Sequence, residues 1–125
     1  MIYQLHIASD IKPEPSDHEI SAALILSEYF QTDITFIKRS HMHTADFLIN
    51  GQVWEHKSPT GNGKRTMQNN LRDADNQSSF VIMDLRRCKM RPEQAMSRIR
   101  YELTKANKIK RLIVIQKNRR ILELK

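Results

Sequence analysis

Apolar and polar residues are spaced along this chain in blocks whose periods predict a succession of helices and strands. In the first clear block, Ser16 and Glu19 have the spacing of a capping box and predict a helix over 17–30. Its apolar stripe is predicted at Ile20, Ala23, Leu24, Ser27 and Phe30. Further helices are expected over 66–77 and 93–106, and strands over 34–37, 45–49, 53–57, 80–85, 112–115 and 120–124.

The order of the predicted elements is helix, three strands, helix, strand, helix and two strands. The runs 80–85 and 112–115 are continuously apolar, which is typical of strands buried on both faces of a sheet. Met1–Ile7 alternates loosely and suits a short edge strand. An antiparallel meander combined with crossover helices predicts an α/β or α+β fold with a mixed sheet. A length of 125 residues suits one domain over 1–125.

The segment that points most directly to chemistry is a predicted hairpin over 45–57. Its Asn50-Gly51 pair separates two apolar runs and favours a two-residue turn between antiparallel strands. A turn that tight folds Asp46 back toward Glu55 and Lys57, which share a face of their strand because side chains alternate. Two carboxylates and an ammonium group can hold a hard divalent cation, Mg²⁺ or Mn²⁺, and orient a water molecule. The hairpin therefore predicts a site for phosphodiester hydrolysis.

Charge is distributed unevenly along the chain, whose formal net charge is +7. Residues 1–33 contain one lysine and six carboxylates, whereas residues 85–125 contain fourteen lysines and arginines against three glutamates. A basic C-terminal third is the electrostatic pattern expected of a protein that binds a nucleic-acid backbone. A solvated basic face, or a surface for an acidic partner protein, would have the same composition.

The sequence also carries signals of compartment. The lone Cys88 argues against a disulfide framework and suits a reducing compartment. No apolar run approaches the roughly 20 residues that span a bilayer. The first residues, MIYQLHIASD, lack the layout of a signal peptide. These features predict a cytoplasmic protein without a membrane partner.

The hairpin sequence TADFLINGQVWEHK resembles the signature of the PD-(D/E)xK nuclease superfamily, with Asp46 on one strand and Glu55-His56-Lys57 on the next. Ala45 stands where that signature often has proline. Together with TMQNNLRDADNQSSFVIMDLRR, the segment is similar to the C-terminal tRNase domains of contact-dependent growth inhibition toxins, over about residues 17–115. The resemblance implies a restriction-endonuclease-like core and a metal-dependent endonuclease acting on tRNA. It also implies a cognate immunity protein as a partner.

The resemblance further implies roles for particular residues. Asp46 and Glu55 would bind Mg²⁺ or Mn²⁺, and Lys57 would assist the attacking water. Glu19 is either a third metal ligand, as an acid on the first helix often is in this superfamily, or the capping-box acid alone. Asp84 could pair with Arg86 or reach the site, and pairing is expected. The residues expected to contact nucleic acid are Lys38, Arg39, Ser58, Lys64, Arg86 and Arg87.

Three other interpretations stay open. A metal-independent ribonuclease of the barnase, EndoU, colicin or RelE type would use His41, His43, Lys57 or Thr60 for acid–base catalysis, with the RNA 2′-hydroxyl as nucleophile. A nuclease of the first type could act on DNA instead, although the resemblance favours RNA. A non-catalytic basic protein could keep the scaffold and bind nucleic acid.

Overall fold

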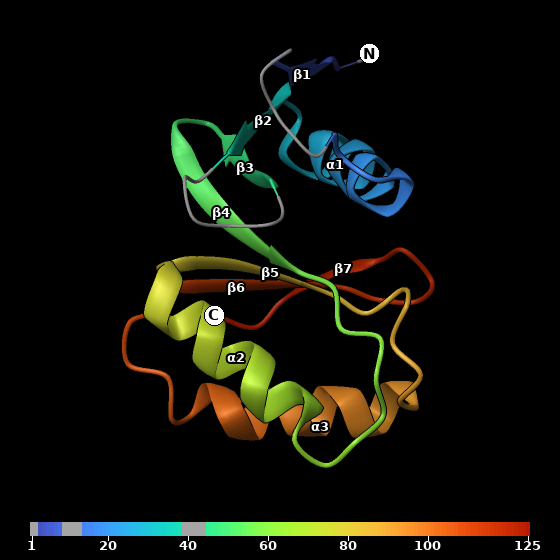
Figure 1. Cartoon of the computed structure of the whole chain (residues 1–125), viewed down its shortest axis with the longest axis vertical. Helices are drawn as coiled ribbons and strands as arrows, with labels where there is room; N and C mark the ends of the chain where they lie inside the picture. Colours follow the sequence, from blue (N-terminus) through green and yellow to red (C-terminus); the bar gives the residue numbers. More distant parts are fainter. Residues whose placement is uncertain (1–2, 9–13, 39–44) are drawn as a thin grey trace. The chain divides into compact units, whose positions relative to one another are not determined.

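The computed structural model describes residues 3–8, 14–38 and 45–125, and the chain divides into two compact units, Met1–Trp54 and Glu55–Lys125 (Figure 1). The described helices are α1 (Asp17–Phe30), α2 (Thr66–Gln77) and α3 (Pro92–Leu103). The described strands are β1 (Leu5–Ile7), β2 (Ile34–Lys38), β3 (Ala45–Ile49), β4 (Gln52–Lys57), β5 (Phe80–Asp84), β6 (Arg111–Ile115) and β7 (Ile121–Glu123). The predicted succession is confirmed, and β1 is the short edge strand expected within Met1–Ile7. The fold is mixed α+β.

In the first unit, β1, β2, β3 and the beginning of β4 form a mixed sheet. Strand β1 pairs in parallel with β2, and the pairs β2–β3 and β3–β4 are antiparallel. Ile49 lies opposite Gln52, which leaves Asn50 and Gly51 as a two-residue turn. Their φ angles of 50° and 80° are both positive, as the type I′ turn favoured by an Asn-Gly pair requires. The predicted hairpin is therefore confirmed.

The core of the first unit is built around aromatic side chains. Phe36 and Phe47, which lie opposite each other on β2 and β3, pack edge to face with ring centroids 5.2 Å apart. Phe30 at the end of α1 packs on Trp54 at 5.6 Å, and Trp54 is 1% exposed. These contacts join α1 to the sheet of this unit.

Helix α1 begins where the capping box predicted, but its buried side is different. The Ser16 hydroxyl accepts from the Glu19 N–H, and the Glu19 carboxylate accepts from the Ser16 N–H at 2.8 Å. The predicted stripe is wrong at Leu24, whose side chain is 51% exposed. The buried side consists of Glu19, Ala22, Ala23, Leu26 and Ser27. Because residues 20–26 are apolar on several sides of the helix, periodicity alone does not select the side that packs.

In the second unit, the end of β4 and strands β5, β6 and β7 form a mixed sheet (Figure 1). Strands β4, β5 and β6 are parallel, and β7 runs antiparallel to β6. Parallel neighbours need crossover connections, and α2 and α3 provide them. Helices α2 and α3 cover one face of this sheet, as Figure 1 shows.

The core of the second unit lies between these two helices and the sheet. Val81 and Met83 on β5 are buried toward α2 and α3, and Ile82 between them is also 0% exposed. The prediction of strands buried on both faces is therefore confirmed. The whole helix-side cluster comprises Met67, Leu71, Ala74, Val81, Met83, Leu85, Cys88, Met90, Ala95, Ile99, Ile109, Leu112 and Val114.

Helix α3 ends at Leu103, three residues before the predicted end. The backbone N–H groups of Thr104, Lys105 and Ala106 each bond to the carbonyl three residues earlier, at 3.0–3.2 Å. The chain therefore tightens into a 3₁₀-like turn after the helix, and the Thr104 hydroxyl donates to the Tyr101 carbonyl at 2.6 Å.

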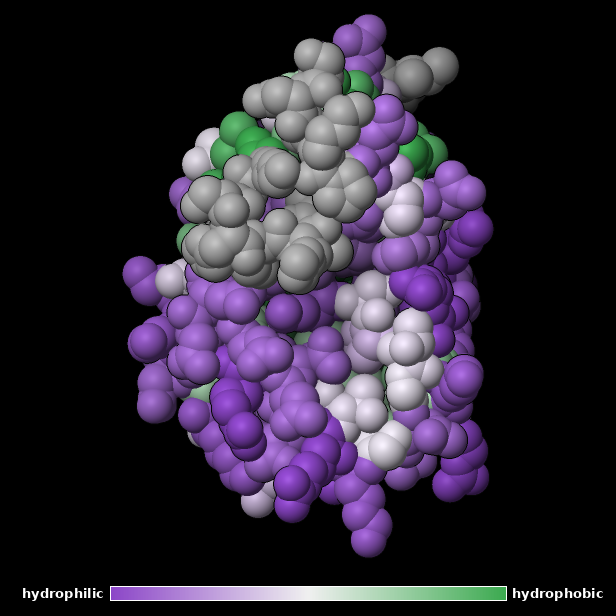
Figure 2. Space-filling view, viewed as in Figure 1, coloured by the Kyte–Doolittle hydropathy of each residue, from purple (hydrophilic) through white to green (hydrophobic). Residues whose placement is uncertain are grey.

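The surface of the second unit is mainly hydrophilic in the view of Figure 2. Within residues 3–8, 14–38 and 45–125, none of the helices has the length and apolar character that a bilayer span requires.

Candidate active site

The acid-x-Lys triplet lies on the last half of β4, in the second unit. Glu55 is in register with Val81 and Lys57 with Met83 on the parallel strand β5. Residues in register on parallel strands point to the same face, so Glu55 and Lys57 are on the face that α2 and α3 cover. The strand thus gives the acid and the lysine a shared face, as the alternation of side chains predicted.

Glu55 is a buried carboxylate beside an ammonium group. Its side chain is 1% exposed, that of Lys57 is 18% exposed, and Lys57 Nζ lies 3.5 Å from Glu55 Oε1. Within the described residues, neither carboxylate oxygen of Glu55 accepts a hydrogen bond. Buried carboxylate oxygens normally have donors, so these lone pairs are suited to a ligand. Their hard oxygen chemistry fits Mg²⁺ or Mn²⁺.

The central residue of the triplet, His56, belongs to the opposite face and has a different partner. Its Nε2 lies 3.0 Å from Asp84 Oδ2, and the Arg86 guanidinium donates to the same carboxylate at 2.9 and 2.8 Å. Burial raises the pKa of Asp84, but the hydrogen bonds with His56 and Arg86 lower that pKa more, and the result is far below its usual value. The predicted pairing of Asp84 with Arg86 is confirmed.

Sequence reasoning missed His56 as a partner of Asp84. The two residues are 28 positions apart, and no local spacing connects them. Only the register of β4 with β5, in which His56 lies opposite Ile82, shows that His56 and Asp84 share a face. A sequence can supply that signal only once the pairing of the two strands is known.

Two further candidate carboxylates lie in the first unit. Asp46 is opposite Ile37 in the β2–β3 pair and is 0% exposed. Glu19 is 6% exposed, and its Oε1 accepts from the Ser16 N–H and hydroxyl at 2.8 and 2.9 Å. Its Oε2 is buried and accepts no hydrogen bond from the described part of the chain. The capping role of Glu19 is confirmed. Its Oε2 is the oxygen suited to binding a ligand.

The residues expected to contact nucleic acid differ in their exposure and in their hydrogen-bond partners. Lys64 and Arg87 are exposed, and the Ser58 hydroxyl is buried without a hydrogen-bond partner among the described residues. The Arg86 side chain is 12% exposed and directs its donors to Asp84. The side chain of Lys38 and the whole of Arg39, His41 and His43 lie outside the described residues.

The fold and these residues define a basic α+β domain with a buried carboxylate held beside a lysine. The model of the family described as "Contact-dependent growth inhibition CdiA C-terminal domain" matches residues 43–121. That match covers more than half of the chain, and the chain belongs to this family.

A solved structure has a similar fold. It is a chain of the "CdiA-CT/CdiI toxin and immunity complex from Burkholderia pseudomallei", with a TM-score of 0.59 and 21% sequence identity over 98% of each chain. At this identity the similarity concerns the fold alone. No curated protein matches the sequence of this chain.

Proposed function

We propose that this chain is the toxin domain of a contact-dependent growth inhibition system and acts as a PD-(D/E)xK-type nuclease on RNA, with tRNA as its substrate. The observation that carries the nuclease proposal is the buried Glu55 carboxylate, 3.5 Å from the Lys57 ammonium group. Membership of the CdiA C-terminal family supports the toxin role. The basic second unit suits a polyanionic substrate in the cytoplasm.

A divalent cation, Mg²⁺ or Mn²⁺, fits the carboxylates in this proposal. Asp46 precedes Phe47, Glu55 follows Trp54, and Phe47 pairs with Trp54 across the hairpin. This chain order is the reason to assign both carboxylates to one site, with Glu19 as a third candidate. Bound there, the cation would activate water and neutralise charge on the phosphate.

Few protein ligands are needed for such a cation. Within the described ranges, no group of three or more His, Cys, Asp or Glu side chains is arranged to hold a metal ion. Mg²⁺ commonly uses one or two carboxylates and completes its coordination with water and substrate phosphates. The carboxylates named here would meet that requirement.

The remaining roles follow from charge and position. The Lys57 ammonium group would orient the attacking water and stabilise negative charge that develops on the phosphate. The Ser58 hydroxyl, buried and without a partner in the described region, would donate to a phosphate oxygen. Exposed cations such as Lys64 and Arg87 would hold the backbone of the RNA.

The test compares total tRNA and plasmid DNA incubated with the purified chain, with Mg²⁺ or with EDTA. We expect cleavage of tRNA that EDTA abolishes. Glu55→Gln and Lys57→Ala should each lower kcat by roughly 100-fold or more, as loss of one stabilising group at a reacting centre does. Glu93→Gln is the matched control, because Glu93 is an exposed carboxylate on α3, and it should leave kcat unchanged.

Other outcomes would identify the alternatives. Cleavage in EDTA that leaves a 2′,3′-cyclic phosphate would identify a metal-independent ribonuclease. Cleavage of DNA alone would replace the substrate but keep the site. Intact tRNA and intact DNA under all conditions would refute the nuclease proposal.

A further inference from the structure

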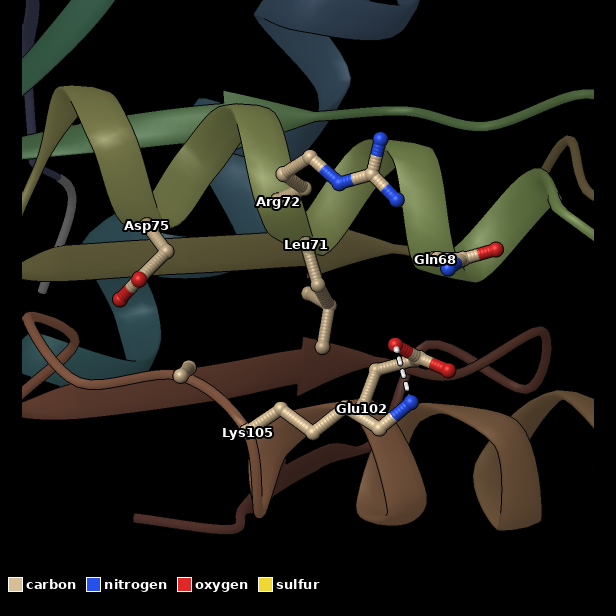
Figure 3. A pocket seen from close by; sticks show the side chains of 7 residues that line it. Gln68, Leu71, Arg72, Asp75, Glu102 and Lys105 are labelled. Atoms are coloured by element: carbon tan, nitrogen blue, oxygen red, sulfur yellow. Dashed lines mark ion pairs between the residues drawn. The ribbon is translucent and has the colours of Figure 1, made fainter.

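A hollow of about 180 Å³ opens in the second unit between α2 and the end of α3 (Figure 3). Leu71 forms an apolar part of its wall and is 2% exposed. Polar side chains surround this residue, namely Gln68, Arg72 and Asp75 from α2, Glu102 from the end of α3 and Lys105 from the turn that follows it. Neither Glu55 nor Lys57 lines the hollow.

The two carboxylates of the hollow already have partners. Asp75 accepts hydrogen bonds from the backbone N–H groups of Asn107, Lys108 and Ile109, at 3.3, 2.8 and 3.0 Å. It therefore fixes the loop that leads from α3 to β6. Glu102 lies 3.9 Å from Lys105 Nζ, the ion pair drawn in Figure 3.

The hydrogen-bond donors that line the hollow have fewer partners than its two carboxylates. The Arg72 guanidinium and the Gln68 amide make no hydrogen bond or ion pair within the described residues, and Arg72 is exposed. Lys105 Nζ lies 4.4 Å from the centre of the Tyr101 ring, and Tyr101 is 57% exposed. Tyr101 contacts Lys105 but does not itself line the hollow, which thus offers the donors of Gln68, Arg72 and Lys105 to an incoming acceptor.

We infer that this hollow is a docking site for an acidic side chain of a protein partner, the cognate immunity protein. The inference rests on the proposed role of the chain as a toxin. A partner carboxylate would be bound by Arg72, with Lys105 at the side of the hollow. Arginine is one of the residue types that most often dominate the energy of protein interfaces. A partner with acidic groups also complements the net charge of +7.

A protein suits this hollow better than RNA does. Asp75 and Glu102 would repel the regularly spaced phosphates of a nucleic-acid strand. A protein surface can present a carboxylate to Arg72 and a hydrogen-bond donor to Glu102 at the same time. The mixed charge of the hollow therefore favours a partner of mixed charge.

The test measures the dissociation constant for the cognate immunity protein, defined as the protein whose co-expression restores growth to cells making this chain. We expect Arg72→Glu to raise the Kd at least about 30-fold, as the loss of an interface hot spot does. Lys105→Glu should raise it by a smaller factor. The matched control is Arg98→Glu, an exposed arginine of α3 outside the hollow, which should change the Kd less than threefold.

A second variant keeps every charge. Gln68→Trp would fill the hollow and should also weaken binding, whereas thermal unfolding of each variant shows that the fold is retained. An equal Kd for Arg72→Glu, Gln68→Trp and Arg98→Glu would overturn the inference. So would the absence of any protein that restores growth.

RNA cleavage, measured on the same variants, separates this inference from the proposed function. Weaker binding of the immunity protein with tRNA cleavage retained supports a protein site. Weaker tRNA binding with unchanged immunity binding would assign the hollow to RNA and overturn the inference. A wild-type chain that binds the immunity protein through the hollow but cleaves nothing would refute only the nuclease activity.

Discussion

At the scale of single residues, the second unit contains two buried carboxylates in opposite circumstances. Asp84 is bound by His56 and by the backbone and guanidinium of Arg86. Among residues 3–8, 14–38 and 45–125, Glu55 has only the Lys57 ammonium group as a partner, at 3.5 Å. Burying a charge is costly unless hydrogen bonds replace the lost water. Asp84 therefore suits a structural role, and Glu55 suits binding of a ligand that supplies the missing partners.

The structural role of Asp84 predicts a large loss of stability on its removal. Asp84→Ala leaves Arg86 and His56 without their shared carboxylate, and we expect the free energy of unfolding to fall by about 3–5 kcal/mol. Urea denaturation at pH 7 measures this change. The control is Glu123→Ala, which breaks a partly exposed ion pair with Arg111 and should cost less than about 1 kcal/mol.

The lowered pKa of Asp84 also predicts that the stability difference between wild type and Asp84→Ala depends on pH. Because the pKa of Asp84 is lowered in the folded chain, the unfolded chain binds more protons just below the ordinary pKa of 3.8. The contribution of Asp84 to stability is therefore complete above that pH and declines as the pH falls toward the folded pKa. The stability difference between wild type and Asp84→Ala should shrink below about pH 4. A difference that is constant from pH 7 to pH 3 would contradict this explanation.

At the scale of elements, local sequence explains how the hairpin forms. The turn between β3 and β4 requires positive φ at both central residues, and Gly51 has a φ of 80°. A Cβ atom added to Gly51 would meet nothing within 4 Å. Replacing Gly51 by alanine would therefore cause no steric clash, and any loss of stability would come from the strain of a positive φ angle.

We expect Gly51→Ala to destabilise the chain by about 1–2 kcal/mol, the cost of left-handed backbone for an L-residue. Gly63→Ala is the matched control, because Gly63 has no left-handed φ and its added Cβ would make an ordinary 3.6 Å contact with Thr66. That control should change stability by less than about 1 kcal/mol. Equal losses in the two variants, measured by urea denaturation, would refute the backbone explanation.

At the scale of the whole molecule, charge is the dominant property. The net charge of +7 comes mainly from the C-terminal third, and most of these cations are exposed. Arg86 and Arg111 are exceptions, since Asp84 and Glu123 bind their guanidinium groups. An anionic partner can therefore contact only the exposed lysine and arginine side chains, and not every cation that the composition counts.

This surface predicts salt-sensitive binding of tRNA if RNA is the substrate. The logarithm of the affinity should fall linearly with the logarithm of salt concentration, because bound phosphates release counterions. Lys64→Ala should reduce the slope by about one, as expected for one phosphate contact. Fluorescence anisotropy between 50 and 200 mM salt measures both effects, with Glu93→Gln as a neutral comparison. An affinity independent of salt would contradict backbone binding.

The sequence by itself determined the features that depend on neighbours a few residues apart. The capping box of α1, the Asn50-Gly51 turn, the order of the elements and the uneven charge belong to this group. The capping box and the turn are fixed by hydrogen bonds and backbone preferences within a few residues, and the order of elements and the charge are read directly from residue types along the chain. The roles of Asp46, Glu55 and Lys57 were also predicted from sequence, and they stay predictions until activity is measured.

Only the tertiary structure decided the features that join distant residues. It selected the buried side of α1, where Leu24 is exposed, and it joined His56 to Asp84 across 28 positions. It also brought Arg72 and Lys105 to one hollow. These outcomes depend on which elements pack together, because strand register and helix packing bring side chains together irrespective of their separation in the chain.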